Sequence, residues 1–245
     1  MDKKVENLKI ASVIENYKLT AWQKIYLGFK SVCDIFIGFI VSLILLPFFI
    51  FMAIAIKIDS RGPVFFKQKR AGKNGKVYNC LKFRSMKTSA PAYVEPSKLN
   101  SNDYITKVGA FMRKTSIDEL PQFLCLAIGK MSLIGYRPAP ITEEPLNSER
   151  KKYGVYNTKP GLTGFAQVNG RDVLAAVPTL KAKYDAYYVQ HISLWMDIKV
   201  TFKTIGSVFF SKDVVEGTSA VQVSKDRNLL DDIKKDSGEN KDENK

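Results

Sequence analysis

The chain has 245 residues, and its 38 Lys and Arg against 24 Asp and Glu give a formal net charge of +14. A hydrophobic content of 45%, with 15 Phe and 11 Tyr, excludes a disordered polycation and predicts a packed core. The three Cys lie far apart and there is a single His, which argues against a disulfide scaffold and a Cys/His zinc site.

An apolar segment extends from Ser31 to Ile56 and contains one charged residue, Asp34. Its last 22 residues carry no charge and would form a helix of about 33 Å, long enough to cross a bilayer. Because 30 mostly polar residues precede the segment, it does not resemble a secretory signal. We expect it to stay with the protein as a membrane segment.

Two membrane paths are open for this segment. Pro47, near its middle, removes a helical hydrogen bond and favours a bend. Lysine and arginine are abundant on both sides, and such residues favour the cytoplasmic side of a membrane. A helix that enters, bends at Pro47 and returns would keep both flanks on that side, with arms of about a dozen residues, too short to span alone. A kinked span is the alternative, because Pro is tolerated in membrane helices.

The segment that follows predicts a basic β-hairpin. The stretches VFFKQKR and VYNCLKF read as short strands, and the turn between them contains Asn74-Gly75. Residues 88–103 are predicted to form a loop. A helix from Thr106 to Arg113 should come next, followed by another that begins at Ser116.

The C-terminal part combines a loop-rich region, a patterned helix and a tail. Pro and Gly recur between residues 136 and 172, which predicts loops that carry a binding surface. From Tyr184 to Phe209, apolar residues recur every three or four positions and predict one helix, lying at the membrane surface or packed on the core. His191 falls on this stripe, so we expect it to be packed or interfacial rather than catalytic. Residues 218–245 are polar and predict a disordered tail.

Asp118 and Glu119, within RKTSIDELPQ, form the candidate acid/base pair. A structural alternative exists, because Ser116 and Glu119 fit a helix-capping box, in which the helix dipole also favours Asp118. Pro121 weakens that alternative, since it removes a hydrogen bond that the fifth helical residue would make. Both interpretations stay open on these residues alone.

Basic residues elsewhere in the chain favour phosphate chemistry at this pair. Arg113 lies five residues before Asp118, and other cations occur in short segments bounded by turns: Lys69, Arg70, Lys82, Arg84, Arg137 and Arg171. Arg binds phosphate oxygens through two parallel hydrogen bonds and offsets charge that develops during transfer. A carboxylate that faces a diphosphate normally requires Mg²⁺ between them, and Asp is a suitable ligand. For each single cation, the alternative is a solvated or lipid-facing side chain.

The sequence becomes recognisable from five motifs in this order: RGPVFFKQKRAG (61–72), LKFRSM (81–86), RKTSIDELPQ (113–122), MSLIGYRPAP (131–140) and KPGLTGFAQVNGR (159–171). From about Lys24 to Gly217 the chain resembles the bacterial sugar transferases, the monotopic polyprenyl-phosphate phosphoglycosyl transferases. It departs from the family pattern at Tyr136, where relatives usually have Pro, and at Phe165, where they have Trp. Some relatives have Ser where this chain has Leu46. These departures spare the charged positions.

The resemblance implies a reaction and roles for individual residues. The family transfers a sugar 1-phosphate from a nucleotide sugar, here expected to be a UDP-sugar, to a polyprenyl phosphate. Asp118 would attack the phosphate next to the sugar and hold a covalent phosphosugar, while Glu119 would act as general base or position the acceptor. Mg²⁺, with Asp118 as its ligand, would neutralise the diphosphate. The resemblance also assigns phosphate, nucleotide or sugar binding to Arg113, Arg137, Gln167, Asn169 and Arg171.

We therefore expect an α+β, mainly helical fold with a re-entrant membrane hairpin bent at Pro47, a small β-hairpin and amphipathic interfacial helices. The expected parts are an N-terminal interfacial segment (1–30), a re-entrant membrane helix (31–56), a cytoplasmic catalytic domain (57–217) and a polar tail (218–245). By resemblance, the protein would be monotopic on the bacterial cytoplasmic membrane. It would contact anionic lipid and no nucleic acid, and a homodimer stays an open alternative.

Two other functions would explain part of the sequence. A non-catalytic basic adaptor that binds anionic lipid or nucleic acid would account for the charge and the anchor. It would give no reason for five ordered motifs around one carboxylate pair. A transferase that uses direct displacement in a ternary complex would form the same product without a covalent intermediate.

Overall fold

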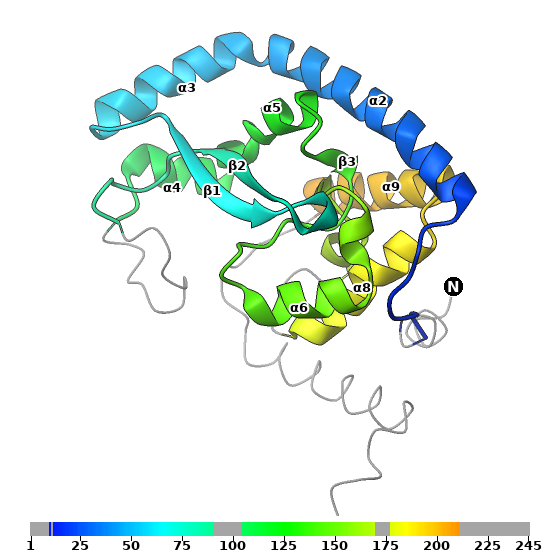
Figure 1. Cartoon of the computed structure of the whole chain (residues 1–245). Coiled ribbons are helices and arrows are strands. Elements are labelled where there is room, and N and C mark those ends of the chain that lie inside the picture. The colour runs from blue at the N-terminus through cyan, green and yellow to red at the C-terminus, as the bar shows by residue number, and fades with distance from the viewer. Residues whose placement is uncertain (1–9, 11, 91–103, 170–176, 211–245) are drawn as a thin grey trace, which may run out of the picture.

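The computed structural model describes residues 10, 12–90, 104–169 and 177–210, with side chains up to residue 206. Two helices, α2 (Ala21–Ile44) and α3 (Leu46–Asp59), follow each other as one arch over the remaining elements (Figure 1). The first elements below the arch are β1 (Phe65–Ala71), η1 (Lys73–Gly75), β2 (Val77–Phe83), α4 (Lys107–Lys114), η4 (Ile117–Glu119) and α5 (Gln122–Ala127). The later ones are β3 (Ser132–Ile134), α6 (Glu144–Lys152), η5 (Val155–Asn157), β4 (Gly161–Thr163), α8 (Pro178–Gln190) and α9 (Leu194–Phe210). The described residues contain two two-stranded sheets, the antiparallel pair β1–β2 and the parallel pair β3–β4, and the expected mainly helical fold with a small β-hairpin is confirmed.

The break in the arch lies at Leu45, two residues before Pro47. Pro47 has no N–H to donate to the carbonyl of residue 43, so the α2 ladder stops there. The Leu45 N–H donates to the Val41 carbonyl (2.9 Å) and its own carbonyl accepts from Phe49 (2.8 Å), so a new helix starts at once. Pro47 falls in the first turn of α3, where an N–H is not needed. The predicted helix break is confirmed, but α2 begins at Ala21 and gives a first arm of 24 residues, longer than expected.

The two faces of α2 have unusual compositions. Its buried residues are small or polar: Asp34, Gly38 and Ser42, spaced by four positions. Large apolar residues on the outer face are each at least 60% exposed: Ile25, Phe29, Val32, Phe36, Phe39, Leu43 and Ile44. A helix on a soluble protein buries its apolar stripe, and large exposed apolar surfaces mark sites of membrane or protein contact. Within the described ranges, α2 is the one helix long and apolar enough to cross a membrane, judged by length and composition.

Polar contacts fasten α2 to the body. The Asp34 carboxylate accepts hydrogen bonds from the Ser132 hydroxyl (2.6 Å) and the Leu133 N–H (3.0 Å), which holds α2 against β3. Nearer the start of α2, Asp197 of α9 accepts from Lys30 Nζ (2.5 Å) and the Tyr26 hydroxyl (2.7 Å). The only acidic residue of the apolar segment is thus part of the fold.

The β-hairpin forms as predicted, with β1 and β2 antiparallel and Asn74 in the left-handed region (φ 57°) at the turn. Side chains alternate between the two faces of a strand, so Arg70 and Lys82 lie on one face and Phe65 on the other. Phe83, paired with Phe65, contacts Phe65 and Phe49 of α3 with ring centroids 5.5 Å apart in each case. One face of the hairpin therefore packs beneath α3, and the other can carry charges.

The helix predicted to start at Ser116 does not form as expected. Ser116 has φ 56° and makes no capping hydrogen bond, so the capping-box alternative is wrong. A single 3₁₀ turn, η4, follows it, and α5 begins only after Pro121. By contrast, the helix predicted from Thr106 to Arg113 is confirmed as α4, with the Thr106 hydroxyl accepting from the Gly109 N–H at 3.0 Å.

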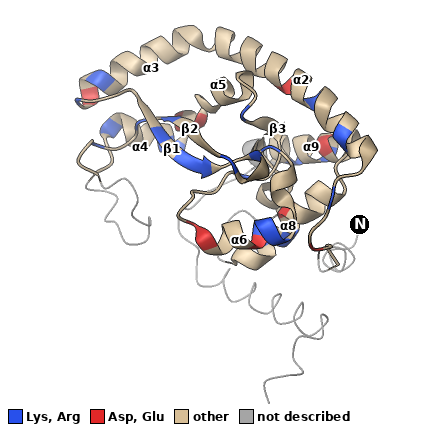
Figure 2. Cartoon of the chain, viewed as in Figure 1, with Lys and Arg blue, Asp and Glu red and all other residues tan. Residues whose placement is uncertain are grey.

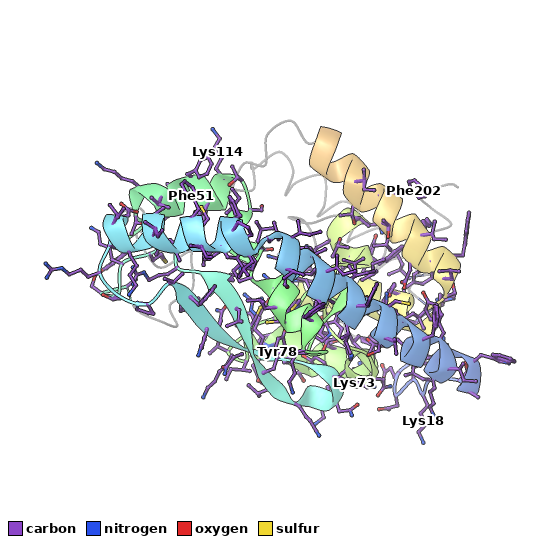
Figure 3. All side chains as sticks on the ribbon, turned by 90° about the horizontal axis from the view of Figure 1, so that it is seen from above. Lys18, Phe51, Lys73, Tyr78, Lys114 and Phe202 are labelled. Carbon is purple, nitrogen blue, oxygen red and sulfur yellow. The ribbon has the colours of Figure 1, made fainter. Side chains whose placement is uncertain are left out.

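The single long helix predicted for the C-terminal part is also wrong. The chain leaves the helix after Gln190 and starts α9 at Leu194. Tyr188 in α8 is buried in the main core, whereas Trp195 and Phe202 in α9 are 75% and 71% exposed. The alternative in which the helix packs on the core is therefore correct for α8. Helix α9 instead has exposed aromatic residues, among them Phe202, which is labelled in Figure 3. The predicted tail lies outside the described residues, as does most of the predicted loop at 88–103.

Gly38 provides a test of how α2 sits on α5. A Cβ atom at Gly38 would lie 2.5 Å from the Ala127 backbone nitrogen, whereas a Cβ at Gly28 meets nothing within 4 Å. Gly38→Ala should lower the free energy of unfolding by about 1–3 kcal/mol through overpacking. Gly28→Ala should raise it by roughly 0.5–1 kcal/mol, because Ala favours the helix. Thermal unfolding in detergent measures both, and equal stability of the two variants would contradict this packing.

Candidate active site

Glu119 is the centre of an ion-pair cluster that joins three segments. Its Oε1 accepts from Lys82 Nζ of β2 (2.8 Å) and from Arg137 Nη2 (2.6 Å), and its Oε2 lies 3.3 Å from Arg137 Nη1. Burial raises the pKa of Glu119, but the charges of Arg137 and Lys82 outweigh burial and hold the pKa far below its ordinary value of 4.5. Glu119 is therefore an ionised carboxylate whose two oxygens are both engaged.

Asp118 has a different environment although it is the preceding residue. Its side chain is 13% exposed, and its Oδ2 lies 3.8 Å from Lys82 Nζ. Burial raises the pKa of Asp118 and the charge of Glu119 adds to the rise, while Lys82 and Arg113 oppose it. Among the described residues, no side chain donates a hydrogen bond to Asp118, and at 3.8 Å Lys82 is an ion-pair partner only. Of the two carboxylates, Asp118 is the one available to a ligand.

The backbone at η4 explains why these neighbours differ. Ser116 adopts the left-handed conformation (φ 56°), which reverses the chain after α4, and Pro121 prevents η4 from merging into α5. In a 3₁₀ helix, consecutive residues are rotated by about 120°. Asp118 and Glu119 consequently leave the turn in different directions, and only Glu119 points between Lys82 and Arg137.

Three further cations predicted for the site have distinct positions. The charge of Arg113 acts on Asp118, and its Nε donates to the Ser85 hydroxyl (2.9 Å). Arg70 donates to the Gln68 side chain and to the Pro138 carbonyl, so it fastens the loop that carries Arg137 onto β1. Lys69 is exposed on the opposite face of the hairpin from Arg70 and Lys82. The structure thus brings Lys82, Arg113 and Arg137 to the carboxylates and leaves Lys69 outside.

Arg84, also predicted to bind substrate, forms hydrogen bonds within the protein. Its side chain is buried and donates to the Ser60 carbonyl (2.6 Å), the Ser60 hydroxyl (2.8 Å) and the Arg61 carbonyl (3.1 Å). These contacts join the end of α3 to the hairpin. The sequence could not distinguish this role, because Arg84 and Lys82 occur in the same motif.

Asn169, one of the nucleotide or sugar residues predicted in the last motif, contacts α9. Asn169 donates to the Phe165 carbonyl (2.8 Å) and accepts from Lys203 Nζ of α9 (2.5 Å). The buried Oε1 of Gln167 has no hydrogen-bond partner among the residues that the structure describes. Arg171 lies outside the described residues. The recorded contacts of Gln167 and Asn169 therefore do not include the Glu119 cluster.

A buried group of charged residues that the sequence does not predict lies next to Tyr136, the neighbour of Arg137. Arg150 and Asp185 form a fully buried ion pair (2.6 Å), and the Arg150 guanidinium lies 5.0 Å from the ring centre of Tyr136. Lys181 of α8 is near this group; burial lowers its pKa, and the charges of Arg150 and Arg137 add to that effect. Lys181 and Asp185 are four residues apart and so lie on one face of α8, which is the one feature of the local sequence that could have indicated this group. Arg150 lies 35 residues before Asp185, so no local sequence pattern connects the two.

The carboxylates suit a Mg²⁺ ion that is shared with a phosphate ligand. The part of the chain that the structure describes has no group of three or more His, Cys, Asp or Glu that could hold a metal ion. Mg²⁺ is commonly bound by one or two carboxylates together with substrate phosphates and water. Asp118 has one long ion-pair contact, to Lys82 at 3.8 Å, whereas Glu119 is held by Lys82 at 2.8 Å and Arg137 at 2.6 Å, so Asp118 is the carboxylate that fits that kind of site.

Comparison with known proteins points to one family. A family model described as bacterial sugar transferase matches residues 25–211. UDP-glucose:undecaprenyl-phosphate glucose-1-phosphate transferase of Escherichia coli (strain K12) is 37% identical over 189 residues, which cover 75% of this chain and 40% of that protein. UDP-N-acetylgalactosamine-undecaprenyl-phosphate N-acetylgalactosaminephosphotransferase of Aeromonas hydrophila is 35% identical over 187 residues, covering 75% of this chain and 44% of that protein.

A shorter relative is matched over nearly its whole length. Exopolysaccharide production protein PSS of Rhizobium leguminosarum bv. phaseoli is 38% identical over 190 residues, which cover 73% of this chain and 94% of that protein. The chain therefore spans less than half of the two proteins named above and almost all of this one.

The contacts of Arg84 predict a loss of stability. Arg84→Gln should lower the melting temperature by roughly 3–10 °C, because the buried guanidinium and its charged hydrogen bonds to Ser60 and Arg61 are lost. Arg61→Gln is the matched control, since Arg61 is exposed and contributes only its backbone carbonyl to this contact. Thermal unfolding of the full chain measures both. An unchanged melting temperature for Arg84→Gln would show that these contacts do not stabilise the fold.

Proposed function

The chain belongs to the bacterial sugar transferase family, and we propose that it transfers a sugar 1-phosphate from a UDP-sugar to a polyprenyl phosphate such as undecaprenyl phosphate. The observation that carries this proposal is the contrast within one turn: Glu119 is bound by two cations, and Asp118 beside it is available. The names of the Escherichia coli and Aeromonas hydrophila relatives contain both a UDP-sugar and undecaprenyl phosphate. Their sugars differ, so the proposal names the class of donor only.

Two displacements at one phosphorus atom account for the reaction. An oxygen of Asp118 attacks the phosphorus that bears the sugar, the bond to the bridging oxygen breaks, and UMP leaves with that electron pair. Asp118 then carries the sugar phosphate as an acyl phosphate. A phosphate oxygen of the polyprenyl acceptor attacks the same phosphorus, and the Asp118 carboxylate leaves. The product is a polyprenyl diphosphate sugar, and the enzyme returns to its starting state.

Glu119 is better suited to positioning than to removing a proton. Its pKa lies far below the ordinary value, which makes it a weak base. The acceptor phosphate is largely ionised at neutral pH and needs little deprotonation. Glu119 instead holds Lys82 and Arg137 next to Asp118, where their charges can stabilise phosphate oxygens during transfer.

Asp118 would hold a Mg²⁺ ion together with the donor, and the ion would supply positive charge that offsets the charge of the diphosphate. Lys82 and Arg113, whose charges already act on Asp118, would add to this positive charge. The metal ion and the protein cations would therefore both stabilise the negative charge of the phosphates.

We further propose that the arch enters the membrane and returns to the same side. The middle of the arch contains no charged residues, and Lys and Arg lie at both of its ends (Figure 2). Both arms pack on the same body: α2 through Asp34 on β3, and α3 through Phe49, Met52 and Ile56 on the core that contains Phe83. A straight span would have to detach one arm. The body would then lie in the cytoplasm, on the bacterial cytoplasmic membrane.

The covalent step can be tested without an acceptor. Full-length protein is incubated with Mg²⁺ and a panel of UDP-sugars labelled in the sugar, and we expect stoichiometric protein labelling with release of UMP for the correct donor. Asp118→Asn should abolish both labelling and turnover, because an amide is a far poorer nucleophile than a carboxylate. Glu144→Gln, an exposed residue of α6, is the control and should keep both. A preparation that turns over with acceptor but never takes up label would reject the covalent route in favour of direct displacement.

The membrane path predicts the accessibility of the two ends of the arch. Lys18→Cys and Lys57→Cys place thiols at exposed positions before α2 and in the last turn of α3. In inside-out vesicles a membrane-impermeant maleimide should label both variants above the unmodified parent, and in right-side-out vesicles it should label neither. Labelling of one variant from each side would establish a straight span.

A further inference from the structure

A cavity of about 330 Å³ lies beneath the first half of α2. Its walls include Leu27 and Ser31 of α2, Ile134 of β3, and Lys73, which is labelled in Figure 3 at the turn of the β-hairpin. None of the residues that form the Glu119 cluster lines it. The cavity is therefore separate from the proposed reaction site.

Positive charge dominates the polar part of this cavity. It is lined by four lysines, Lys24, Lys30, Lys73 and Lys159, and by one carboxylate, Asp34. The two oxygens of Asp34 are engaged by Ser132 and Leu133, and Lys30 is paired with Asp197. Within the described ranges, Lys24, Lys73 and Lys159 form no ion pair. Three ammonium groups thus border the space without a bound carboxylate.

Lys159 shows that this charge is poorly compensated. Its Nζ donates to the Ser31 hydroxyl (2.5 Å), a neutral acceptor on α2. Burial lowers the pKa of Lys159; Asp34 opposes this, and the charge of Lys73 adds to it. Two ammonium groups that repel each other beside a cavity would be stabilised by an anion placed between them. Each ammonium also offers up to three hydrogen-bond donors, which suits the oxygens of a phosphate.

The uncharged walls combine hydroxyl groups with several aliphatic side chains, and the cavity lies next to the surface that carries the exposed apolar residues of α2. Leu19, Leu27, Val32, Ile134 and Ile192 line it. Trp22, on the same stretch of α2, is 81% exposed, and Trp favours the level of lipid headgroups. We infer that this cavity binds the phosphate group of an anionic lipid, with the lysines on the phosphate and the apolar walls on the start of the lipid chains. The inference is independent of the transfer reaction.

Binding of a short-chain lipid to the full protein in neutral detergent tests this site. Dihexanoyl phosphatidylglycerol, titrated below its micelle concentration, should bind at one saturable site, measured by calorimetry. Lys73→Gln and Lys159→Gln should each weaken the affinity by about tenfold, because each removes a charged donor to the phosphate. Lys76→Gln is the matched control: it lies in the same turn, is exposed and does not line the cavity.

A second titration with inorganic phosphate at matched ionic strength identifies the source of the anion. We expect inorganic phosphate to bind at least tenfold more weakly than the lipid, because it lacks apolar groups to bury. Equal affinity for inorganic phosphate would overturn the assignment to a lipid. Equal lipid affinity of Lys73→Gln and Lys76→Gln would overturn the site itself, and since Lys73 is exposed, its substitution leaves the fold intact.

Discussion

The ion pairs of Glu119 hold together the segments from which the candidate site is built. Lys82 comes from the hairpin, Glu119 from a single 3₁₀ turn and Arg137 from the loop after β3, and these segments share little regular secondary structure. Partly buried cations next to each other would be unfavourable without a carboxylate between them. Glu119 removes that repulsion and at the same time fixes both cations beside Asp118. On the proposed mechanism, a structural ion pair thus prepares the environment in which Asp118 reacts.

The rest of the body fixes these segments from several sides. Arg70 ties the Arg137 loop to β1, and the buried Arg150–Asp185 pair supports the ring of Tyr136 next to Arg137. These contacts restrict where Arg137 can point. The position of Arg137, which lies in a loop, therefore depends on charged residues that the sequence alone would assign to the surface.

The features that the sequence predicted well are those with local causes. The hairpin follows from its turn residues, α4 from the Thr106 cap, and the break in the arch from the missing N–H of Pro47. The pattern at Ser116 misled because a capping box and a reversing turn share the same residues, and only the left-handed φ separates them. The three-residue break after Gln190 could not be predicted, because the spacing of the apolar residues is the same before and after it. The choice of Asp118, Lys82, Arg113 and Arg137 came from chemistry and resemblance, whereas Arg84 and Lys181 depend on contacts between distant segments.

The bond between Asp34 and Ser132 bears on how such a protein is made. Ser132 lies 98 residues after Asp34, so α2 leaves the ribosome long before its partner exists. Until then the helix carries an unpaired carboxylate, and insertion of an Asp at the centre of a membrane helix costs about 2.5–3.5 kcal/mol. Once the body has folded, Asp34 is buried against β3 and the surface left outside is apolar. On the proposed membrane path, this arrangement favours entry of the finished molecule from the cytoplasm over threading of α2 into the bilayer during synthesis.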